Sequence, residues 1–546
     1  MNTILKNIRE DLKILLLDFN IRENIQISVS KLDTFDIQIN NLVKYENHHS
    51  ITEIKEAVNE KLKSIPYISK IDFGKKFFIN IKFNYFELSK IVTNLNDNYV
   101  LDSPKNIIFD YGGPNIGKPL HVGHLRSLNI GRSLYNMNQF IGNKVKSDIH
   151  MGDWGMPIAQ IITYIEEENI DIKSLKVDDL ESIYPISSKL YSEDTNFEEK
   201  AKERNKNLNT GHQKTLDKWN YIRNLSLASL KENLNILNHN FDYWYGESDV
   251  NHLIPDMLDG LLKKDKVRYD ENALISNEDT DPKILITKSD GSYLYITTDL
   301  ATVLYREENI PYDRAYYVVD NRQSLHFQQL FSSLKFFGFK NLEYEHVSFG
   351  TLNDESGNPF KTREGGTKPL LELFKETYDY IYKINKDLNK ESIDLLTNTV
   401  LTFSDLLTNR KTNYKFNLKK FTNISGKTGI YVQYSQVRAK KLLEHIDGQG
   451  EFGAERNLSS AENQLMSDLF LFSYYLERSL ELSEPHHLAN YLYEISNSFN
   501  LFYEEEKILS IQDEELKNSK IYITNLFLNT CHSAMYCLGI KPVNKM

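Results

Sequence analysis

The stretch Asn106–Ser127, NIIFDYGGPNIGKPLHVGHLRS, decides how the chain is organised. Its apolar run Ile107–Phe109 predicts a buried strand, which the following glycines and proline end. We expect an amphipathic helix that begins at His121 and ends before Gly142, and then a second strand over Val145–His150. Two strands joined by a helix form a βαβ unit, whose nucleotide-binding end lies where the first strand meets the helix.

Two histidines stand at this strand–helix junction. His121 and His124 flank Gly123 in the pattern H-x-G-H, and Lys118 comes just before them. Imidazole groups at a helix N-terminus can donate to a polyphosphate, the helix dipole attracts the anion, and a glycine lets a base or ribose approach closely. The alternative is a pair of structural helix-capping histidines, which the strand before and the helix after disfavour.

Two glycine patterns imitate other nucleotide-binding motifs. Residues Gly112–Lys118 satisfy G-x-x-x-x-G-K, but Pro119 stands where a P-loop needs Ser or Thr to hold magnesium. Residues Gly448–Gly453 spell G-x-G-x-x-G after a charged helical segment rather than a strand, which indicates a surface turn. A P-loop phosphotransferase is therefore the weaker alternative.

The segment P-N-I-G-K-P-L-H-V-G-H-L-R-S resembles the first motif of class I aminoacyl-tRNA synthetases, in the form found in arginyl-tRNA synthetases. The resemblance implies a Rossmann-like α/β catalytic domain with a parallel sheet over about 101–370. The polar, helical stretch at about 163–240 is expected to be an insertion in that domain. The remaining expectations are an N-terminal α+β module over 1–100 that contacts tRNA and an all-α anticodon-binding bundle over 371–546.

Composition sets the outer bounds. The chain has 546 residues, enough for about three or four domains. Two cysteines, Cys531 and Cys537, cannot make a disulfide framework, which predicts a reducing cytoplasm. The apolar run Ile14–Leu17 is too short for a signal or membrane segment, so no membrane is expected. A net charge of −11 does not exclude a tRNA partner, since only the contact face must be positive.

Two later segments, FDYWYGESDV and YLYITTDLA, resemble arginine-pocket segments of the family. A guanidinium offers five donors, so a selective pocket needs carboxylates for bidentate pairing and an aromatic or hydroxyl wall. Glu247, Asp299 and Tyr295 supply these groups. The resemblance adds Gln323, at the start of a later helix, and Asn115 of the first motif. In isolation, the Y-x-x-x-D pattern is more often structural.

The second half of the active site is expected in a glycine-rich loop within His346–Thr367. There Phe-Lys-Thr-Arg replaces the KMSKS string of class I enzymes, and the alternative is a basic surface loop. The resemblance implies that Lys118 takes over part of the missing charge. The implied catalytic residues are Lys118, His121, His124, Lys361 and Arg363, and the implied ATP-binding residues are His121, Gly123, His124 and Lys361.

The stretch HMGDWGMP and the C-terminal helices carry further candidates. Asp153 and Trp154 suit a polar anchor and a packing plate or, equally, a structural turn, and Met156 and Pro157 replace the family's threonine and glutamine. A later helix combines aromatic planes, an amide and a cation, the chemistry that binds single-stranded RNA loops. The predicted tRNA-binding residues are Tyr431, Gln433, Tyr434 and Arg438. An amphipathic core helix is the alternative.

The resemblance implies ATP-dependent activation of L-arginine to arginyl-adenylate and its transfer to the 3′ end of tRNA(Arg). ATP with Mg²⁺ would be a co-substrate, and neither a permanently bound cofactor nor a protein-bound metal is expected. The partners would be tRNA(Arg), L-arginine and ATP, and the chain is expected to act as a cytoplasmic monomer. The alternative is a catalytically altered paralogue that regulates by binding RNA. The intact histidine motif and the pocket carboxylates weigh against it.

Overall fold

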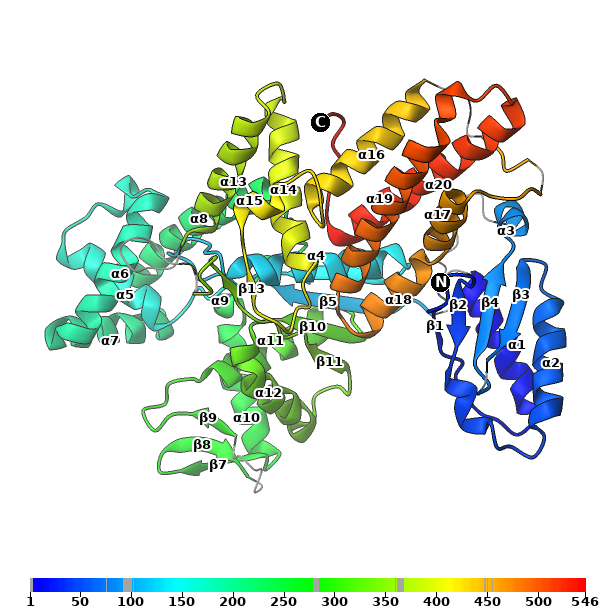
Figure 1. The fold of residues 1–546 in the computed structure, drawn as a ribbon. Coiled ribbons are helices and arrows are strands. Elements are labelled where there is room, and N and C mark those ends of the chain that lie inside the picture. The colour runs from blue at the N-terminus through cyan, green and yellow to red at the C-terminus, as the bar shows by residue number, and fades with distance from the viewer. Residues whose placement is uncertain are drawn as a thin grey trace.

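The chain folds into an α+β module at its N-terminus, a central α/β part and a helical C-terminal part (Figure 1). The computed structural model describes residues 3–74, 76–91, 101, 103–277, 284–358, 360, 368–445, 448, 450–453 and 455–546. Among these residues, no helix is both long and apolar enough to span a lipid bilayer.

The N-terminal module contains a four-stranded antiparallel sheet in the order β1-β2-β4-β3. Its elements are α1 (Thr3–Leu17), β1 (Ile27–Val29), β2 (Ile37–Ile39), α2 (Ile51–Lys63), β3 (Ile68–Phe73), β4 (Ile79–Phe83) and α3 (Tyr85–Ile91). Ile54, Val58 and Leu62 form the buried stripe of α2, at the spacing of a helix that packs on one face.

A parallel sheet in the order β11-β10-β5-β6 lies at the centre of the molecule. Its strands are β5 (Asn106–Tyr111), β6 (Lys144–Asp148), β10 (Arg314–Val318) and β11 (Glu343–His346). Helix α4 (His124–Phe140) connects β5 to β6, which pair in parallel, so the predicted βαβ unit is confirmed. The predicted Rossmann-like α/β fold, with its α+β module and all-α bundle, is likewise confirmed.

The element bounds differ slightly from the prediction. Helix α4 begins at His124 and not at His121, because the His124 N–H donates to the His121 carbonyl at 2.8 Å and closes a turn before the helix. Strand β6 ends at Asp148, because the chain then bends and His150 adopts a φ of +26°.

Both faces of the parallel sheet are covered. Tyr316 and Val318 of β10 join a core that includes Leu128 of α4, whereas Ala315 and Tyr317 join a second core. Helices α11 (Tyr295–Asn309) and α12 (Ser324–Phe337) supply that second core. Alternate residues of one strand thus face different cores, as in a doubly wound sheet.

Two excursions leave this sheet. The predicted helical insertion is formed by α5 (Met156–Glu167), α6 (Val177–Glu193), α7 (Thr195–Asn209) and α8 (Gln213–Ile236). After α9 (Glu247–Val250) and α10 (Ile254–Lys263) comes a small antiparallel sheet that the sequence analysis missed. Its strands are β7 (Val267–Asp270), β8 (Ala273–Ser276) and β9 (Leu285–Thr287).

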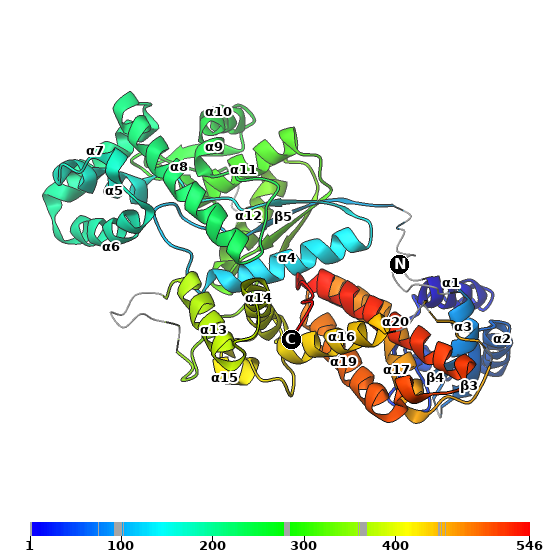
Figure 2. The same cartoon turned by 90° about the horizontal axis from the view of Figure 1, so that it is seen from above.

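The C-terminal part packs on both other parts. Its elements are α13 (Leu370–Ile384), α14 (Lys390–Leu406), β13 (Tyr414–Lys415), α15 (Leu418–Phe421), α16 (Gly429–Glu444), α17 (Ser460–Phe470), α18 (Phe472–Glu481), α19 (His486–Glu506) and α20 (Glu514–Leu538). Strand β13 pairs in parallel with β12 (Leu352–Asn353), and the C-terminal end of α20 packs against α4 (Figure 2). Arg9 of the N-terminal module pairs with Glu477 of α18 at 2.7 Å.

Candidate active site

A pocket of about 460 Å³ opens beyond the carboxyl ends of β5 and β10. Its lining comes from the end of β5, the turn that follows and the start of α4, from the end of β10 and the residues after it, from residues 349–352 after β11, and from Phe360. Ligands of doubly wound sheets bind at this edge of the sheet. His121, Gly123, His124 and Gln323 of the predicted site all line the pocket.

Backbone groups orient both histidine rings through their Nδ1 atoms. The Gly123 N–H donates to Nδ1 of His121 at 3.1 Å, and the His121 N–H donates to Nδ1 of His124 at 3.0 Å. Burial lowers the pKa of His124 to about 3, and the adjacent His121 adds to the shift. Burial also lowers the pKa of His121, and the charges of Lys118 and Arg322 lower it further. The lowered pKa values favour uncharged rings at neutral pH, and the N–H groups that donate to Nδ1 favour the tautomer with Nε2–H as the donor available to the pocket, although Nδ1 of His124 also lies 3.3 Å from the His121 carbonyl.

Gly123 is required by close approach. Its φ of −62° is open to any residue, but an added Cβ would stand 2.8 Å from Cε1 and 2.9 Å from Nδ1 of His121. A side chain at position 123 would displace the ring that the Gly123 N–H orients.

The structure places the two predicted arginine-binding carboxylates on adjacent helices, close enough for Asp299 to affect the pKa of Glu247. Glu247 begins α9, and Asp299 lies on α11, which packs on α9. Burial raises the pKa of Glu247 to about 7; His150 opposes this shift, whereas Asp153 and Asp299 add to it. Asp299 Oδ2 lies 2.5 Å from Nε2 of His326, a partner that the sequence analysis missed.

The other residues predicted to bind arginine, Tyr295, Asn115 and Gln323, lie in three different settings. Tyr295, in the first turn of α11, is 76% exposed. Asn115 forms a bridge with Gly152, where an added Cβ would stand only 2.0 Å from Asn115 Oδ1. Gln323 is exposed and lines the pocket that contains His121 and His124.

Asp153 is a polar anchor, so the anchor alternative for this residue is confirmed. It is fully buried, and it accepts from Arg223 Nε at 2.6 Å and from the Ser248 N–H at 2.9 Å. It thereby ties α8 to the start of α9, next to Glu247. Trp154 packs against Trp219 with ring centres 5.2 Å apart.

A buried charged network that the sequence analysis missed supports the ends of β5 and β6. Arg306 is 1% exposed, and its Nη2 contacts Asp110 and Asp148 at 2.6 Å each. Despite burial, contact with Asp148 raises the pKa of His150 to about 9. Asp110 also lines the pocket. The one sequence signal for it was an acidic residue at the end of an apolar strand.

The predicted cations of the site are not all in the pocket. Lys118 is not among the residues that line the described pocket, and its Nζ lies 3.9 Å from the ring centre of Tyr184 on α6. Lys361 and Arg363 lie outside the described residues.

Four predicted RNA-contacting residues lie on α16, and they differ in exposure. Tyr431, Tyr434 and Arg438 are half-buried, and Arg438 lies over the Tyr434 ring at 4.5 Å. We correct the prediction for Gln433, which is 0% exposed. Its amide donates to the Lys541 carbonyl at 2.8 Å and accepts from the Val543 N–H at 3.0 Å, so it fixes the C-terminal segment and offers no surface to RNA.

Arg126 connects the pocket to the C-terminal part. It is 1% exposed, and its Nε donates to Asp405 at 2.9 Å. Its Nη1 donates to the carbonyls of Gly350 and Thr412 at 2.9 and 2.7 Å. Because Gly350 lines the pocket, one buried side chain holds the pocket wall against the segment that leads into the bundle.

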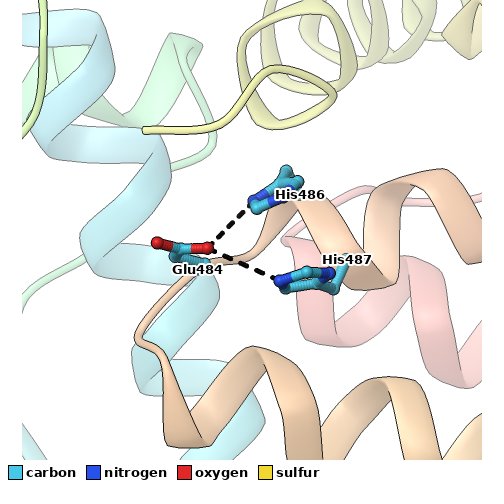
Figure 3. A group of neighbouring side chains, drawn as sticks. All are labelled: Glu484, His486 and His487. Carbon is cyan, nitrogen blue, oxygen red and sulfur yellow. Dashed lines mark ion pairs between the residues drawn. The ribbon is translucent and has the colours of Figure 1, made fainter. Parts of the chain in front are cut away.

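Glu484, His486 and His487 form a second link near this junction (Figure 3). The Glu484 carboxylate lies 3.5 Å from His487 Nε2 and 3.8 Å from His486 Nδ1. Although all three could ligate a metal ion, Lys411 already pairs with this carboxylate at 2.9 Å. We therefore regard the group as a structural link between α19 and the loop that carries Lys411.

Comparison with known proteins identifies two family models. Residues 87–418 match the tRNA synthetases class I (R) catalytic domain, and residues 432–546 match the DALR anticodon binding domain. The arginine–tRNA ligase of Agathobacter rectalis is 35% identical over 541 residues, covering 90% of each chain. That of Francisella tularensis subsp. novicida is 33% identical over 525 residues, also covering 90% of each chain.

Solved structures show the same fold. Arginyl-tRNA synthetase from Plasmodium falciparum superposes with a TM-score of 0.83 at 23% identity and covers 100% of both chains. The Thermus thermophilus arginyl-tRNA synthetase gives a TM-score of 0.83 at 19% identity, covering 99% of this chain and 100% of that one. With the matching catalytic and anticodon-binding models and the extent of the sequence identity, this places the chain in the arginyl-tRNA synthetase family of class I tRNA synthetases.

Proposed function

We propose that the protein is an arginine–tRNA ligase, which activates L-arginine with ATP and transfers it to tRNA(Arg). The observation that carries this proposal is the pair of neutral, oriented histidines at the start of α4, in a pocket at the carboxyl edge of a parallel sheet. The carboxylates Glu247 and Asp299 beside that edge support arginine as the amino acid.

The first step needs no protein nucleophile. A carboxylate oxygen of arginine attacks the α-phosphorus of ATP. The bond between this phosphorus and the oxygen that bridges it to the β-phosphorus breaks, and pyrophosphate leaves with the electron pair. ATP enters as its magnesium complex. His121 and His124 would donate Nε2–H to the phosphate oxygens on which charge accumulates, and the positive end of the α4 dipole adds to this stabilisation. Lys118, Lys361 and Arg363 would supply further positive charge.

Glu247 and Asp299 would pair with the guanidinium of the substrate, and Tyr295, Asn115 and Gln323 would complete the site. Arginine brings a planar fork that can bridge two carboxylates, whereas lysine brings a point charge. An analogue without these donors would leave Glu247 without a cationic partner and Asp299 with His326 alone, which is costly enough to give selectivity without editing.

In the second step, the 3′-terminal hydroxyl of tRNA attacks the arginyl carbonyl and AMP leaves. We assign tRNA contacts to the module over 1–100 and to the bundle over 371–546, with Tyr431, Tyr434 and Arg438 as contact residues. The chain would act as a monomer in the cytoplasm.

An aminoacylation assay with each of the twenty amino acids and total tRNA tests the proposal. We expect ATP-dependent charging with arginine alone. Charging with a different amino acid, or RNA binding without any charging, would overturn it.

A further inference from the structure

Two arginines line the described part of the pocket, and they differ in burial and in the number of their protein partners. Arg126 is buried, and its Nε and Nη1 are committed to Asp405, Gly350 and Thr412. Arg322 follows β10 in a short 3₁₀ turn, Asn321–Gln323, and its side chain is 82% exposed. Although Nη2 of Arg126 has no hydrogen-bond partner among the residues that the structure describes, it is buried, so Arg322 is the more accessible of the two to a ligand that enters the pocket.

The Arg322 guanidinium is already held in place. Its Nε donates to Asp320 Oδ1 at 2.8 Å and its Nη2 donates to Asp320 Oδ2 at 2.9 Å, while the Arg322 backbone N–H also donates to Oδ1 at 2.8 Å. Asp320 is itself fixed, because it bridges to Phe349 on the neighbouring segment. Binding by Arg322 would therefore cost little side-chain entropy.

This pairing leaves donors unused. A guanidinium has five N–H groups, and Asp320 occupies one edge of the fork. Across the described residues, no other protein acceptor contacts the Arg322 side chain. The positive charge of Arg322 is felt at the histidine pair, since it lowers the pKa of His121.

We propose that Arg322 is an ATP-binding residue that contacts the phosphates of the nucleotide from the β10 side of the pocket. This inference relies on the proposed function for the identity of the ligand. A planar fork with free N–H groups suits phosphate oxygens, which it can engage in two parallel, charge-assisted hydrogen bonds. The histidines would meet the same anion from the α4 side.

The test compares ligands with and without phosphate. In the full-length protein, Arg322→Gln should weaken binding of Mg·ATP about tenfold, as expected for the loss of a charge-assisted contact. Binding of adenosine should change less than about twofold on the same reasoning, because adenosine lacks the phosphates. Arg322→Lys should recover part of the ATP affinity, since it keeps the charge and loses the fork.

Arg268→Gln is the matched control. Arg268 is an exposed arginine on β7, outside the pocket lining, and it contacts Asn277. Its ATP affinity and thermal midpoint should equal those of the unsubstituted protein, and the midpoint of Arg322→Gln should match as well.

Three outcomes would overturn the inference: unchanged ATP binding in Arg322→Gln, an equal loss of ATP and adenosine binding, or a loss of arginine binding alone. These outcomes differ from failure of the proposed function, which would show as no arginine-dependent activity in the unsubstituted protein.

Discussion

At the scale of single residues, the chemistry depends on protonation states that the fold imposes. His121 and His124 lie three residues apart, yet each receives a backbone N–H on Nδ1, which favours the tautomer with Nε2–H. The sequence pattern predicts the pair and its place at a strand–helix junction. It does not predict the tautomer, because that depends on the turn of residues 121–124, which replaces the expected first helical turn.

Replacing either histidine should affect the chemical step. His121→Ala and His124→Ala are each expected to lower kcat for ATP–pyrophosphate exchange, measured with arginine and tRNA present, by on the order of 10²-fold, since preorganised donors to developing charge contribute that much. His124→Gln, which can still donate, should lose less. Unchanged exchange in both alanine variants would contradict the assignment.

Glu247 makes a prediction about pH. Its pKa is about 7 in the unliganded protein, so it is half protonated near neutral pH. At the proposed site, a bound guanidinium would favour the ionised carboxylate and lower this pKa, so binding of arginine should release a proton. The KM for arginine should therefore fall as pH rises, by about tenfold between pH 6 and pH 8 if only ionised Glu247 binds.

Glu247→Gln provides the control for this titration. It should raise the KM for arginine and make it nearly independent of pH over the same range. Measurements of the KM for ATP at both pH values separate this effect from the rest of the pocket, because burial keeps His124 neutral throughout. A flat KM for arginine in the unsubstituted protein would contradict the role of Glu247.

At the scale of elements, the local sequence pattern predicts helices and strands whose residues are close together in the chain. The βαβ unit follows from the apolar run of β5 and the helical period of α4. Strands β7–β9 have only three or four residues each, too short to show a period, and the sequence analysis missed them. The long-range partners were also beyond reach: Arg306 meets Asp110 across 196 positions and Asp148 across 158.

Helix α16 shows that a role in RNA binding can be assigned to an aromatic or amide side chain only when its burial is known. We expect Tyr434→Ala to weaken tRNA binding by about 1–3 kcal/mol, the contribution of one stacked base, with no change in the thermal midpoint. Gln433→Ala should instead lower the thermal midpoint and leave tRNA binding unchanged. It removes the hydrogen-bond partner of the Val543 N–H and of the Lys541 carbonyl, at a cost of about 1–3 kcal/mol of stability. Filter binding and thermal unfolding of both variants distinguish these roles, and a thermal collapse of Tyr434→Ala would make Tyr434 a core residue.

At the scale of the whole molecule, the N-terminal module, the catalytic sheet and the helical bundle are joined by buried polar contacts. Arg126 and Asp405 are 1% exposed each and come from different parts of the chain. Neither sequence segment predicts its partner in the other, because an ion pair between distant residues leaves no periodic pattern in the sequence. The three-part order of the chain was predictable from composition and resemblance, and the contacts that fix the parts against one another were not.

Breaking this pair should be costly in a specific way. Asp405→Ala leaves the Arg126 charge buried and should lower stability by about 3–5 kcal/mol, measured as a shift of the urea unfolding midpoint. It should also raise the KM for ATP, because Arg126 holds Gly350 in the pocket wall. The double variant Arg126→Met/Asp405→Leu should recover much of the stability and not the ATP affinity. Wild-type stability of Asp405→Ala would show that the pair is dispensable.

The separation of Arg126 and Asp405 along the chain also determines how long one of them waits for the other during synthesis on the ribosome. Asp405 is made 279 residues after Arg126, which takes roughly 14 to 56 s at about 5–20 residues per second. During that interval the emerging catalytic sheet holds an arginine whose counter-charge does not yet exist. The proposed ATP pocket should therefore be completed only after residues 405–412, the end of α14 and the segment after it, have emerged, so nascent chains that stop before them should bind no ATP.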